Sequence, residues 1–382
     1  MNKIFFINPM SYNNLSLYDY SILKNISNDI EVVYFCSKNN ELLKNLNNKK
    51  NIKIKKIFKY HNKILMLKIF SYFFSLIKLF YYVFKFKPKI IHFQWFKIPF
   101  IDLLFLIKIK IIKPRIKIIL TVHNLLPHDT SMNIFYNIIY KLIDYKIFHS
   151  NKTKIQYIKN FNVKKINKIN SLFIVEHPML NLRNLIYNQN QFNKTYTKLF
   201  YELKKENVFI FSVLGFISYY KGVDLIIESW KKSKILYNNP NVLLIIAGKP
   251  SYNIEVIKDT NIIYDLEFIT NEKYLSYLKL TDVLLLPYRE ISQSGVLAAA
   301  INEKIPVLVS NAGGLNEILS YGKVGWSVPK NNQHKLQLKM EKIFQHKLNK
   351  FISQHSWKVI QEKYSEIKIS NKTQKIYKSL LK

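Results

Sequence analysis

The amino-acid sequence predicts an α/β protein of two domains, each built on a parallel, doubly wound sheet. Short apolar runs of strand length alternate with helix-like segments along the chain, an order typical of parallel sheets with helical crossovers. The runs are continuous rather than alternating in polarity, which indicates strands buried on both faces. A chain of 382 residues exceeds the usual size of a single core. We therefore expect two domains, at 1–178 and 208–345, joined by a polar, Asn-rich linker at 179–207.

The expected strands divide evenly between the two halves. In the first half they are residues 3–8, 30–36, 89–95, 117–124 and 145–150, and in the second half 208–215, 241–249, 261–268, 282–288 and 306–311. Helices are expected between them, most clearly at 222–237 and 271–280. No repeat of fixed short period is present, so a solenoid is not expected.

The chain is strongly basic, with 59 Lys and Arg against 24 Asp and Glu and a formal net charge of +35. Such a charge favours contact with nucleic acid or with anionic lipid. The alternative explanation is compositional drift, because Lys, Ile, Asn, Phe and Tyr are all abundant and all have A/T-rich codons. Either way, lysines near an anionic bilayer are attracted by about 1 kcal/mol each.

The single cysteine and the N-terminus bear on the compartment. Cys36 lies in an apolar run and is expected to be a small buried hydrophobe, and one cysteine excludes an internal disulfide framework. The first ten residues resemble a buried strand rather than a signal peptide. No run reaches the ~18 uncharged apolar residues of a spanning helix. We expect a soluble or peripheral protein in a reducing compartment.

Several ligand-binding motifs are absent from the sequence. It contains no helix-turn-helix, zinc-finger or RNA-recognition pattern, so specific nucleic-acid binding is not expected. It also has no phosphate-binding loop of the P-loop type and no G-x-G-x-x-G. The nearest approach to a metal-binding Asp-x-Asp pair is Asp265-Leu266-Glu267. We expect no metal and no cofactor.

Two strands of the second half end in glycine close to lysine. Gly215 follows the run 208–214 and precedes Lys221, while Gly248 and Lys249 end the run 241–249. Glycine lets a ligand approach the backbone, lysine supplies a positive charge, and ligands of open α/β sheets collect at the carboxyl ends of strands. The alternative is an ordinary strand-to-helix loop with surface lysines.

A third strand runs into the small-residue turn Ser294-Gly295-Val296, which opens a helix. The first amides of a helix lack internal partners and lie at the positive end of its dipole, so they can hold a phosphate. The next strand ends at residues 311–315 and leads to Glu317. A plain βαβ unit without a ligand is the alternative interpretation.

At this point the sequence resembles the family 4-type glycosyltransferases. The resemblance covers the second half, where the family's motifs occur in order: KGVDLII at 221–227, IAGK at 246–249, TDVLLLPYRE at 281–290, QSGVL at 293–297, IPVLVSNAGGLNE at 305–317 and GWSVP at 325–329. In the first half KPKIIHFQW at 87–95, LTVHNLLPHD at 120–129 and IVEHP at 174–178 are similar to family segments.

The resemblance implies two Rossmann-like domains facing a cleft, the GT-B arrangement, with C-terminal helices at 346–382 that cross back to the first domain. It also implies transfer of a sugar from a UDP- or GDP-sugar to a growing surface glycan or a lipid-linked acceptor. Lys221 would bind the diphosphate with the amides of Ser294, Gly295 and Val296, and Glu317 would contact the sugar or ribose. Gly215, Gly248 and Lys249 complete the expected donor site, and no metal would be needed.

The sequence departs from the family at two carboxylates. Aligning Gly295 and Pro306 places Ser292 and Ala300 where many members carry glutamates. Glu290 lies two positions before Ser292 and does not replace the missing glutamate. These departures leave two other hypotheses open. One is a catalytically silent sugar- or lipid-binding subunit, and the other is a sugar-nucleotide epimerase of the same fold.

The first half offers histidines for the acceptor side. His123 ends the run 117–122, followed by Asn124 and by His128. A histidine at a strand end can position the donor or manage an acceptor proton near neutral pH. We predict His123 as the catalytic residue, with Asn124 and His128 on the acceptor side, and His92 as a packing residue.

Residues 63–85 form a candidate membrane-binding helix. On a helical projection Lys63, Lys68, Lys78, Lys85 and two serines occupy about 140° of arc, and the rest is Leu, Ile, Phe and Tyr. A wide apolar face with a basic edge is typical of interfacial helices, although a core helix also needs an apolar face. We expect a cytoplasmic protein associated peripherally with the inner face of the membrane.

Overall fold

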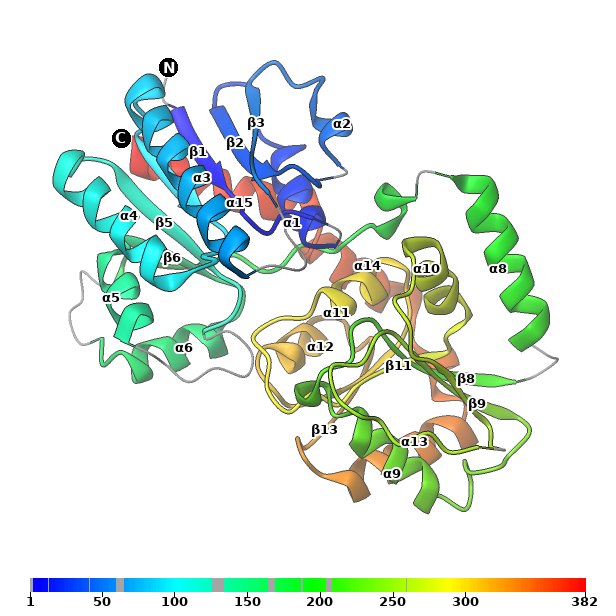
Figure 1. Cartoon of the computed structure of the whole chain (residues 1–382). Helices are drawn as coiled ribbons and strands as arrows, with labels where there is room; N and C mark the ends of the chain where they lie inside the picture. Colours follow the sequence, from blue (N-terminus) through cyan, green and yellow to red (C-terminus); the bar gives the residue numbers. More distant parts are fainter. Residues whose placement is uncertain are drawn as a thin grey trace. The chain divides into compact units, whose positions relative to one another are not determined.

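The computed structural model describes residues 3–12, 14–40, 42–59, 65–125, 134–163, 169–186, 188–203, 208–258 and 260–382. The chain divides into two compact units (Figure 1). The first unit comprises Met1–Pro178 and Ser365–Lys382, and the second comprises Met179–Tyr364.

The first unit contains a seven-stranded parallel sheet, in the order β3-β2-β1-β4-β5-β6-β7 among the described residues. Its strands are β1 Lys3–Ile7, β2 Glu31–Ser37, β3 Ile52–Phe58, β4 Ile90–Phe93, β5 Lys117–Val122, β6 Tyr145–Phe148 and β7 Leu172–Ile174. Its helices are α1 Asn14–Leu23, α2 Leu43–Leu46, α3 Leu65–Phe86, α4 Pro99–Ile112, α5 Ile134–Leu142, α6 Asn151–Asn160 and α15 Glu366–Leu381.

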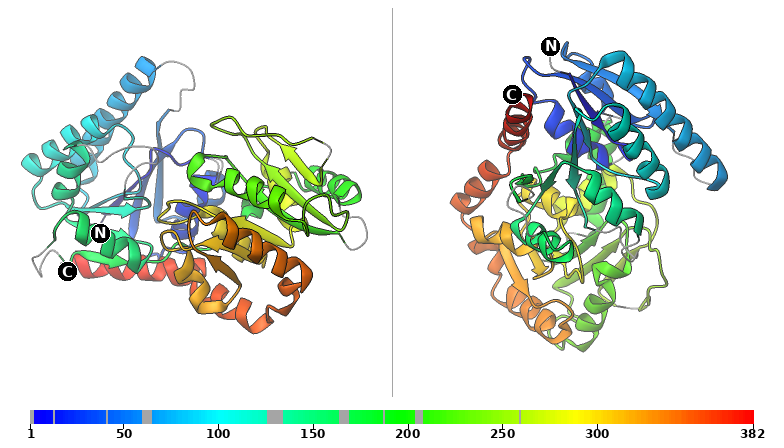
Figure 2. Two further views of the ribbon diagram at one scale, coloured as in Figure 1. Left: turned by 90° about the horizontal axis from the view of Figure 1, so that it is seen from below. Right: turned by 90° about the vertical axis from the view of Figure 1, so that its left-hand side faces the viewer.

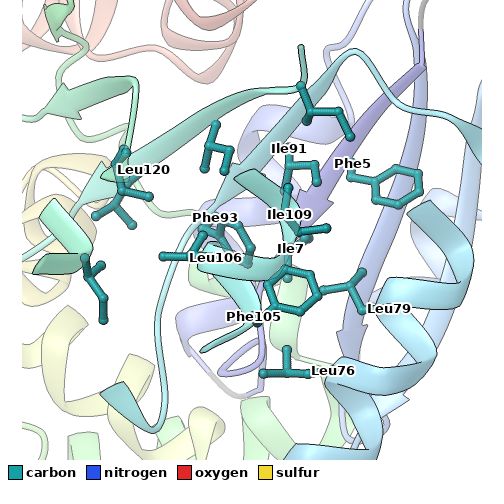
Figure 3. Close-up of a cluster of buried hydrophobic side chains, with 14 of the residues drawn as sticks. Phe5, Ile7, Leu76, Leu79, Ile91, Phe93, Phe105, Leu106, Ile109 and Leu120 are labelled. Carbon is teal, nitrogen blue, oxygen red and sulfur yellow. The ribbon is translucent and has the colours of Figure 1, made fainter. Parts of the chain in front are cut away.

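Helices cover both faces of this sheet. On one face α3 and α4 direct leucine, isoleucine and phenylalanine side chains onto β1, β4 and β5, as Figure 3 shows for Leu76, Leu79 and Leu106. On the other face α1, α2 and α15 pack against the alternate side chains of the same strands. Because side chains alternate along a strand, each strand buries two faces, and this accounts for the continuous apolar runs.

In the second unit the described residues form a six-stranded parallel sheet, in the order β10-β9-β8-β11-β12-β13. Its strands are β8 Phe209–Leu214, β9 Val242–Ala247, β10 Ile262–Asp265, β11 Val283–Leu286, β12 Val307–Ser310 and β13 Gly325–Val328. Its helices are η1 Leu182–Leu185, α8 Gln189–Leu203, η2 Tyr219–Lys221, α9 Val223–Lys232, α10 Asn271–Leu280, α11 Gly295–Asn302, α12 Leu315–Gly322, α13 Gln333–Gln345, η3 Leu348–Phe351 and α14 Gln354–Lys363.

The predicted fold class is confirmed, since both sheets are parallel and carry helical crossovers. All ten expected strands are present. Cys36 is buried, as expected. Strands β3, β7 and β13, which are edge strands of the two sheets, were not predicted.

The structure differs from the expected domain boundaries at two places. Residues 179–207, expected as a linker, carry η1 and α8 and are part of the second unit, where α8 packs against α10. The segment from 346 was expected to return to the first domain, but α14 stays with α11 and α12. Only α15 returns, because its Ile369, Ile376 and Tyr377 enter the first core.

Candidate functional site

Three predicted donor-site residues meet at the carboxyl end of β8. Gly215 has φ +87°, and a Cβ at this position would lie 3.7 Å from Lys221 Nζ and 3.9 Å from the side chain of Val296. The ring of Tyr274, from α10, would lie 3.5 Å from the same point. The structure therefore brings together the glycine of β8, the lysine of η2 and the first turn of α11.

Lys221 is the most informative charge in this group. Its side chain is buried, with 6% exposed, and burial lowers its pKa from 10.5 to about 8. In the described part of the chain no carboxylate pairs with it. Burying an ammonium without a counter-charge is unfavourable, and a bound anion would offset that cost. Lys221 is thus placed to bind an anion.

The turn that carries Lys221 is held by Arg289, which the sequence analysis did not identify. The two terminal nitrogens of Arg289 donate to the two carboxylate oxygens of Asp224 at 2.9 and 2.6 Å. One of them also donates to the carbonyl of Tyr219 at 2.8 Å, and the guanidinium lies 4.1 Å from the centre of that ring. Gly222, at φ +69°, lets the turn approach Pro287, whose carbonyl oxygen would lie 2.5 Å from a Cβ.

The first turn of α11 supplies backbone donors. Ser294 caps this helix, because its Oγ accepts a hydrogen bond from the N–H of Leu297 at 3.2 Å. The amides of Gly295 and Val296 precede the first helical hydrogen bond and have no acceptor within the helix. A Cβ at Gly295 would meet only the side chain of Leu180, at 3.4 Å. The turn is open to a ligand and is not closed by its own chain.

The turn before α12 packs against the segment that leads into α11. Gly313, at φ +49°, lies so close to Ile291 that a Cβ would be 1.6 Å from the Ile291 carbonyl oxygen. The N–H of Gly314 also donates to the carbonyl of Ser292 at 3.3 Å. Glu317, half-buried in the first turn of α12, is thereby held in the same region of the unit as α11.

At the end of β9, Gly248 and Lys249 have different roles. Gly248, at φ +142°, contacts Gly215 directly, since a Cβ would lie 2.3 Å from the Gly215 carbonyl oxygen. The Gly215 N–H in turn donates to the carbonyl of Ala247 at 2.9 Å. Lys249 is exposed, and its carbonyl accepts from the N–H of Ile217 at 2.9 Å. Gly248 therefore shapes the site, whereas Lys249 lies at its periphery.

This unit matches a known family. Residues 197–359 fit the family described as "Glycosyl transferases group 1". This part of the chain belongs to the group 1 glycosyl transferases. The resemblance found in the sequence is confirmed for the second unit, and the family supports glycosyl transfer as the function. No curated protein sequence matches the chain.

Solved structures of glycosyl-transfer proteins share the fold over the whole chain. Sucrose-phosphate synthase from Thermosynechococcus elongatus has a TM-score of 0.73 at 13% identity, covering 100% of this chain and 99% of its own. A glycosyltransferase from Rickettsia africae ESF-5 has a TM-score of 0.70 at 15% identity, covering 100% and 99%. Anabaena HepE in complex with UDP-glucose has a TM-score of 0.71 at 14% identity, covering 99% and 100%. At these identities they establish the GT-B fold.

The two positions at which the sequence departs from the family's glutamates lie in and before α11. Ala300 is fully buried in α11, and Ser292 is half-buried in the segment before it. Glu290 is exposed. Over the described ranges, no three His, Cys, Asp or Glu side chains form a metal-ligand group.

His123 lies in the first unit, directly after β5, in a group of buried or half-buried aromatic side chains. The indole of Trp95 stacks on its ring, with centroids 4.7 Å apart. The ring of Tyr18 meets it edge-on, also at 4.7 Å. Burial, and secondarily the neighbouring histidines, lowers the pKa of His123 well below its usual range. The imidazole is therefore neutral at pH 7.

Both ring nitrogens of His123 have a side-chain neighbour. Its Nε2 lies 3.3 Å from Gln94 Oε1, and because an amide oxygen only accepts, the Nε2–H donates to it. Its Nδ1 lies 3.2 Å from His149 Nε2, and His149 Nδ1 donates to the carbonyl of Val175 at 2.8 Å. A neutral imidazole held by these contacts orients a hydroxyl better than it abstracts a proton.

His92 has structural contacts, as the sequence analysis predicted. His92 Nδ1 lies 2.6 Å from the hydroxyl of Tyr377, and Nε2 lies 2.8 Å from that of Thr121, which is a buried packing role. Asn124 is half-buried after His123. His128, predicted on the acceptor side, lies outside the described residues.

Proposed function

We propose that the protein transfers a hexose from a UDP- or GDP-sugar to a glycan or lipid-linked acceptor in surface polysaccharide synthesis. One observation carries the proposal. In a group 1 glycosyl transferase domain, the buried ammonium of Lys221 lies beside Gly215 and the first turn of α11. A cation and free helix N-terminal amides at one point suit a diphosphate.

The proposed roles follow from this geometry. Lys221 binds the diphosphate together with the amides of Gly295 and Val296, and Glu317 contacts the ribose or the sugar. As the bond to the sugar breaks, negative charge grows on the leaving diphosphate, and the lysine and the helix dipole stabilise it. These groups supply the positive charge, so we propose a metal-independent reaction. The UDP-glucose bound to HepE is consistent with a UDP-sugar donor.

His123 is proposed as the contribution of the first unit. It carries no positive charge at pH 7, and its Nε2–H donates to Gln94 Oε1. We therefore assign it to orienting a sugar hydroxyl, with Asn124 beside it.

The proposal is tested with purified protein and a panel of UDP, GDP, ADP and their sugars. Isothermal calorimetry should give a micromolar Kd for either uridine diphosphate or guanosine diphosphate. Turnover of the sugar donor should continue in the presence of EDTA. Absence of binding to every member of the panel would refute the donor site. Binding with turnover only after a divalent metal is added would refute metal independence.

A second candidate function is a sugar-binding subunit without catalytic activity. The observation in its favour is that Ser292 and the buried Ala300 occupy the two glutamate positions. Such a subunit would bind the diphosphate as tightly as an active enzyme does. It would neither hydrolyse the donor nor transfer its sugar to any acceptor offered.

A further inference from the structure

Helix α3 exposes a continuous apolar row to solvent. Eight of its large side chains are 40–58% exposed, and seven of these lie along one row: Met66, Phe70, Phe73, Phe74, Ile77, Tyr81 and Phe84. Their spacing of three and four places them within about 100° of arc. The buried side chains Tyr72, Leu76, Leu79 and Val83 lie on the opposite side and hold α3 on the sheet. The helix therefore has one apolar row for the core and a second one that the described residues leave exposed.

Helix α4 continues this surface. Four of its large side chains are exposed as well: Phe100, Leu104, Ile111 and Ile112. Figures 1 and 2 show α4 beside α3, and Lys113, which ends α4, places Nζ 4.9 Å from the ring centre of Phe84. We call these eleven residues the α3–α4 apolar face. At ~200 Å² per free side chain, they expose on the order of 1,000 Å², more than the ~300–600 Å² patch of a typical monomer.

The segment that carries this face is almost entirely basic. Residues 65–125 contain eleven Lys and Arg and a single acidic residue, Asp102. That carboxylate is buried and accepts hydrogen bonds from the N–H groups of Lys97 and Ile98 at 3.0 and 2.8 Å, so it does not reach the surface. Lys78 and Lys85 are exposed at one edge of the apolar row of α3. A second copy of the chain would bring the same positive charges together, whereas an anionic bilayer offers the complementary charge.

The fold also restricts how α3 can meet a bilayer. Among the helices in the described residues, α3 alone is long and apolar enough to span a membrane by length and composition. Spanning would strip its buried row from the core and separate the Tyr72 hydroxyl from the Asp102 carboxylate that it contacts. Ser75, expected on a polar edge, is in fact buried and donates to the carbonyl of Ile57. Helix α3 must therefore contact a bilayer along its side and not by spanning it.

We propose that the α3–α4 apolar face inserts into the interfacial layer of an anionic bilayer, with α3 lying along the membrane plane. The apolar rows enter the boundary between headgroups and acyl chains, and the flanking lysines contact lipid phosphates. This binding does not depend on the transfer reaction, because neither a donor nor an acceptor takes part in it.

The test is co-sedimentation of the full chain with vesicles. Wild-type protein should bind mixed phosphatidylglycerol–phosphatidylcholine vesicles at least about tenfold more tightly than pure phosphatidylcholine vesicles. The triple variant Phe70→Ser, Phe74→Ser, Ile77→Ser should lose about tenfold or more in partition. These side chains face solvent, so the thermal unfolding temperature should not fall.

A matched control removes three equally large exposed side chains from the second unit, Tyr201→Ser, Phe268→Ser and Phe351→Ser. It should bind within about twofold of wild type. A separate charge test compares Lys78→Glu, Lys85→Glu with a control of two second-unit lysines.

The control pair for charge is Lys335→Glu, Lys358→Glu, which changes the net charge by the same amount. Only the α3 pair should weaken binding to the anionic vesicles. Equal losses for test and control variants, or no vesicle binding by wild type, would overturn the proposal. It would also be overturned by a concentration-dependent dimer that the triple serine variant abolishes, because the occupant would then be a second copy.

Discussion

Substituting Lys221 separates two effects of opposite sign, because the residue is buried and charged. Burial lowers its pKa from 10.5 to about 8, and at 1.36 kcal/mol per pKa unit this corresponds to a cost of about 3 kcal/mol in the unliganded fold at pH 7. Lys221→Met removes that cost and fits the buried stem. The unliganded variant should therefore unfold at a temperature several degrees higher than wild type.

Ligand binding should change in the other direction. Loss of a charge-assisted contact to a diphosphate costs about 3 kcal/mol, which is roughly a 100-fold rise in Kd for UDP or GDP by calorimetry. As a control, Lys234→Met removes an exposed lysine of the same unit and should change neither quantity. Unchanged diphosphate affinity in Lys221→Met would refute the donor-site assignment. A lower unfolding temperature would refute the argument from burial.

The pH dependence of binding follows from the same pKa. In the free protein the Lys221 ammonium is charged below about pH 8 and neutral above it. A bound diphosphate favours the charged form, so affinity should stay level up to pH 8 and then fall, by at most about tenfold per pH unit. In Lys221→Met this fall should disappear.

Four further substitutions test other parts of the structure. Gly295→Ala should leave thermal unfolding unchanged, because the added Cβ makes only an ordinary contact with Leu180, and it should weaken UDP or GDP binding about tenfold. Gly313→Ala should destabilise the fold by more than about 2 kcal/mol. Asp224→Asn breaks the two-point contact with Arg289, so calorimetry should show diphosphate affinity reduced several-fold, with stability lowered by about 1 kcal/mol. His149 has a folded pKa of about 3, below its unfolded value of about 6.5, so its stabilising contribution is present above pH 6.5 and lost as the pH falls. Between pH 7 and 5, denaturant titrations should show wild type losing about 2 kcal/mol more than His149→Phe.

The sequence predicted the central strands well and the edges poorly. Central strands are covered on both faces, so they need a continuous apolar run, and β1, β4, β8 and β11 all have one. The edge strand β3 places exposed or half-buried lysines between its apolar residues, and β7 and β13 are only three and four residues long. A search for continuous apolar runs cannot find such strands.

The linker prediction differed from the structure for a related reason. Helix α8 is polar over most of its length and buries mainly Phe192 and Leu199 against the second unit. A surface helix with a narrow apolar contact has nearly the composition of a linker. The spacing of seven between its two buried residues was the available signal.

The site shows which contacts a sequence can and cannot specify. Lys221 and Ser294 were predictable because each follows a strand at a fixed, short distance, and parallel strands end at the same edge of the sheet. The contact between Arg289 and Asp224 was not, because it depends on the distance between two turns that are far apart in sequence. Tyr274 lacked a signal as well, since its ring reaches Gly215 from the interior of α10.

The positions of the glycines bear on whether the second unit binds a ligand. All eight lie between residues 215 and 325, in a chain whose composition otherwise disfavours them. Contacts within the chain account for most of them, as at Gly248 and Gly325, where a Cβ would lie within 2.3 Å of a backbone oxygen. Gly295 is different, because an alanine there would make only an ordinary contact with Leu180. The packing of the described residues gives no reason for the absent side chain at the start of α11, whereas the proposed diphosphate, lying next to Lys221, would require that absence.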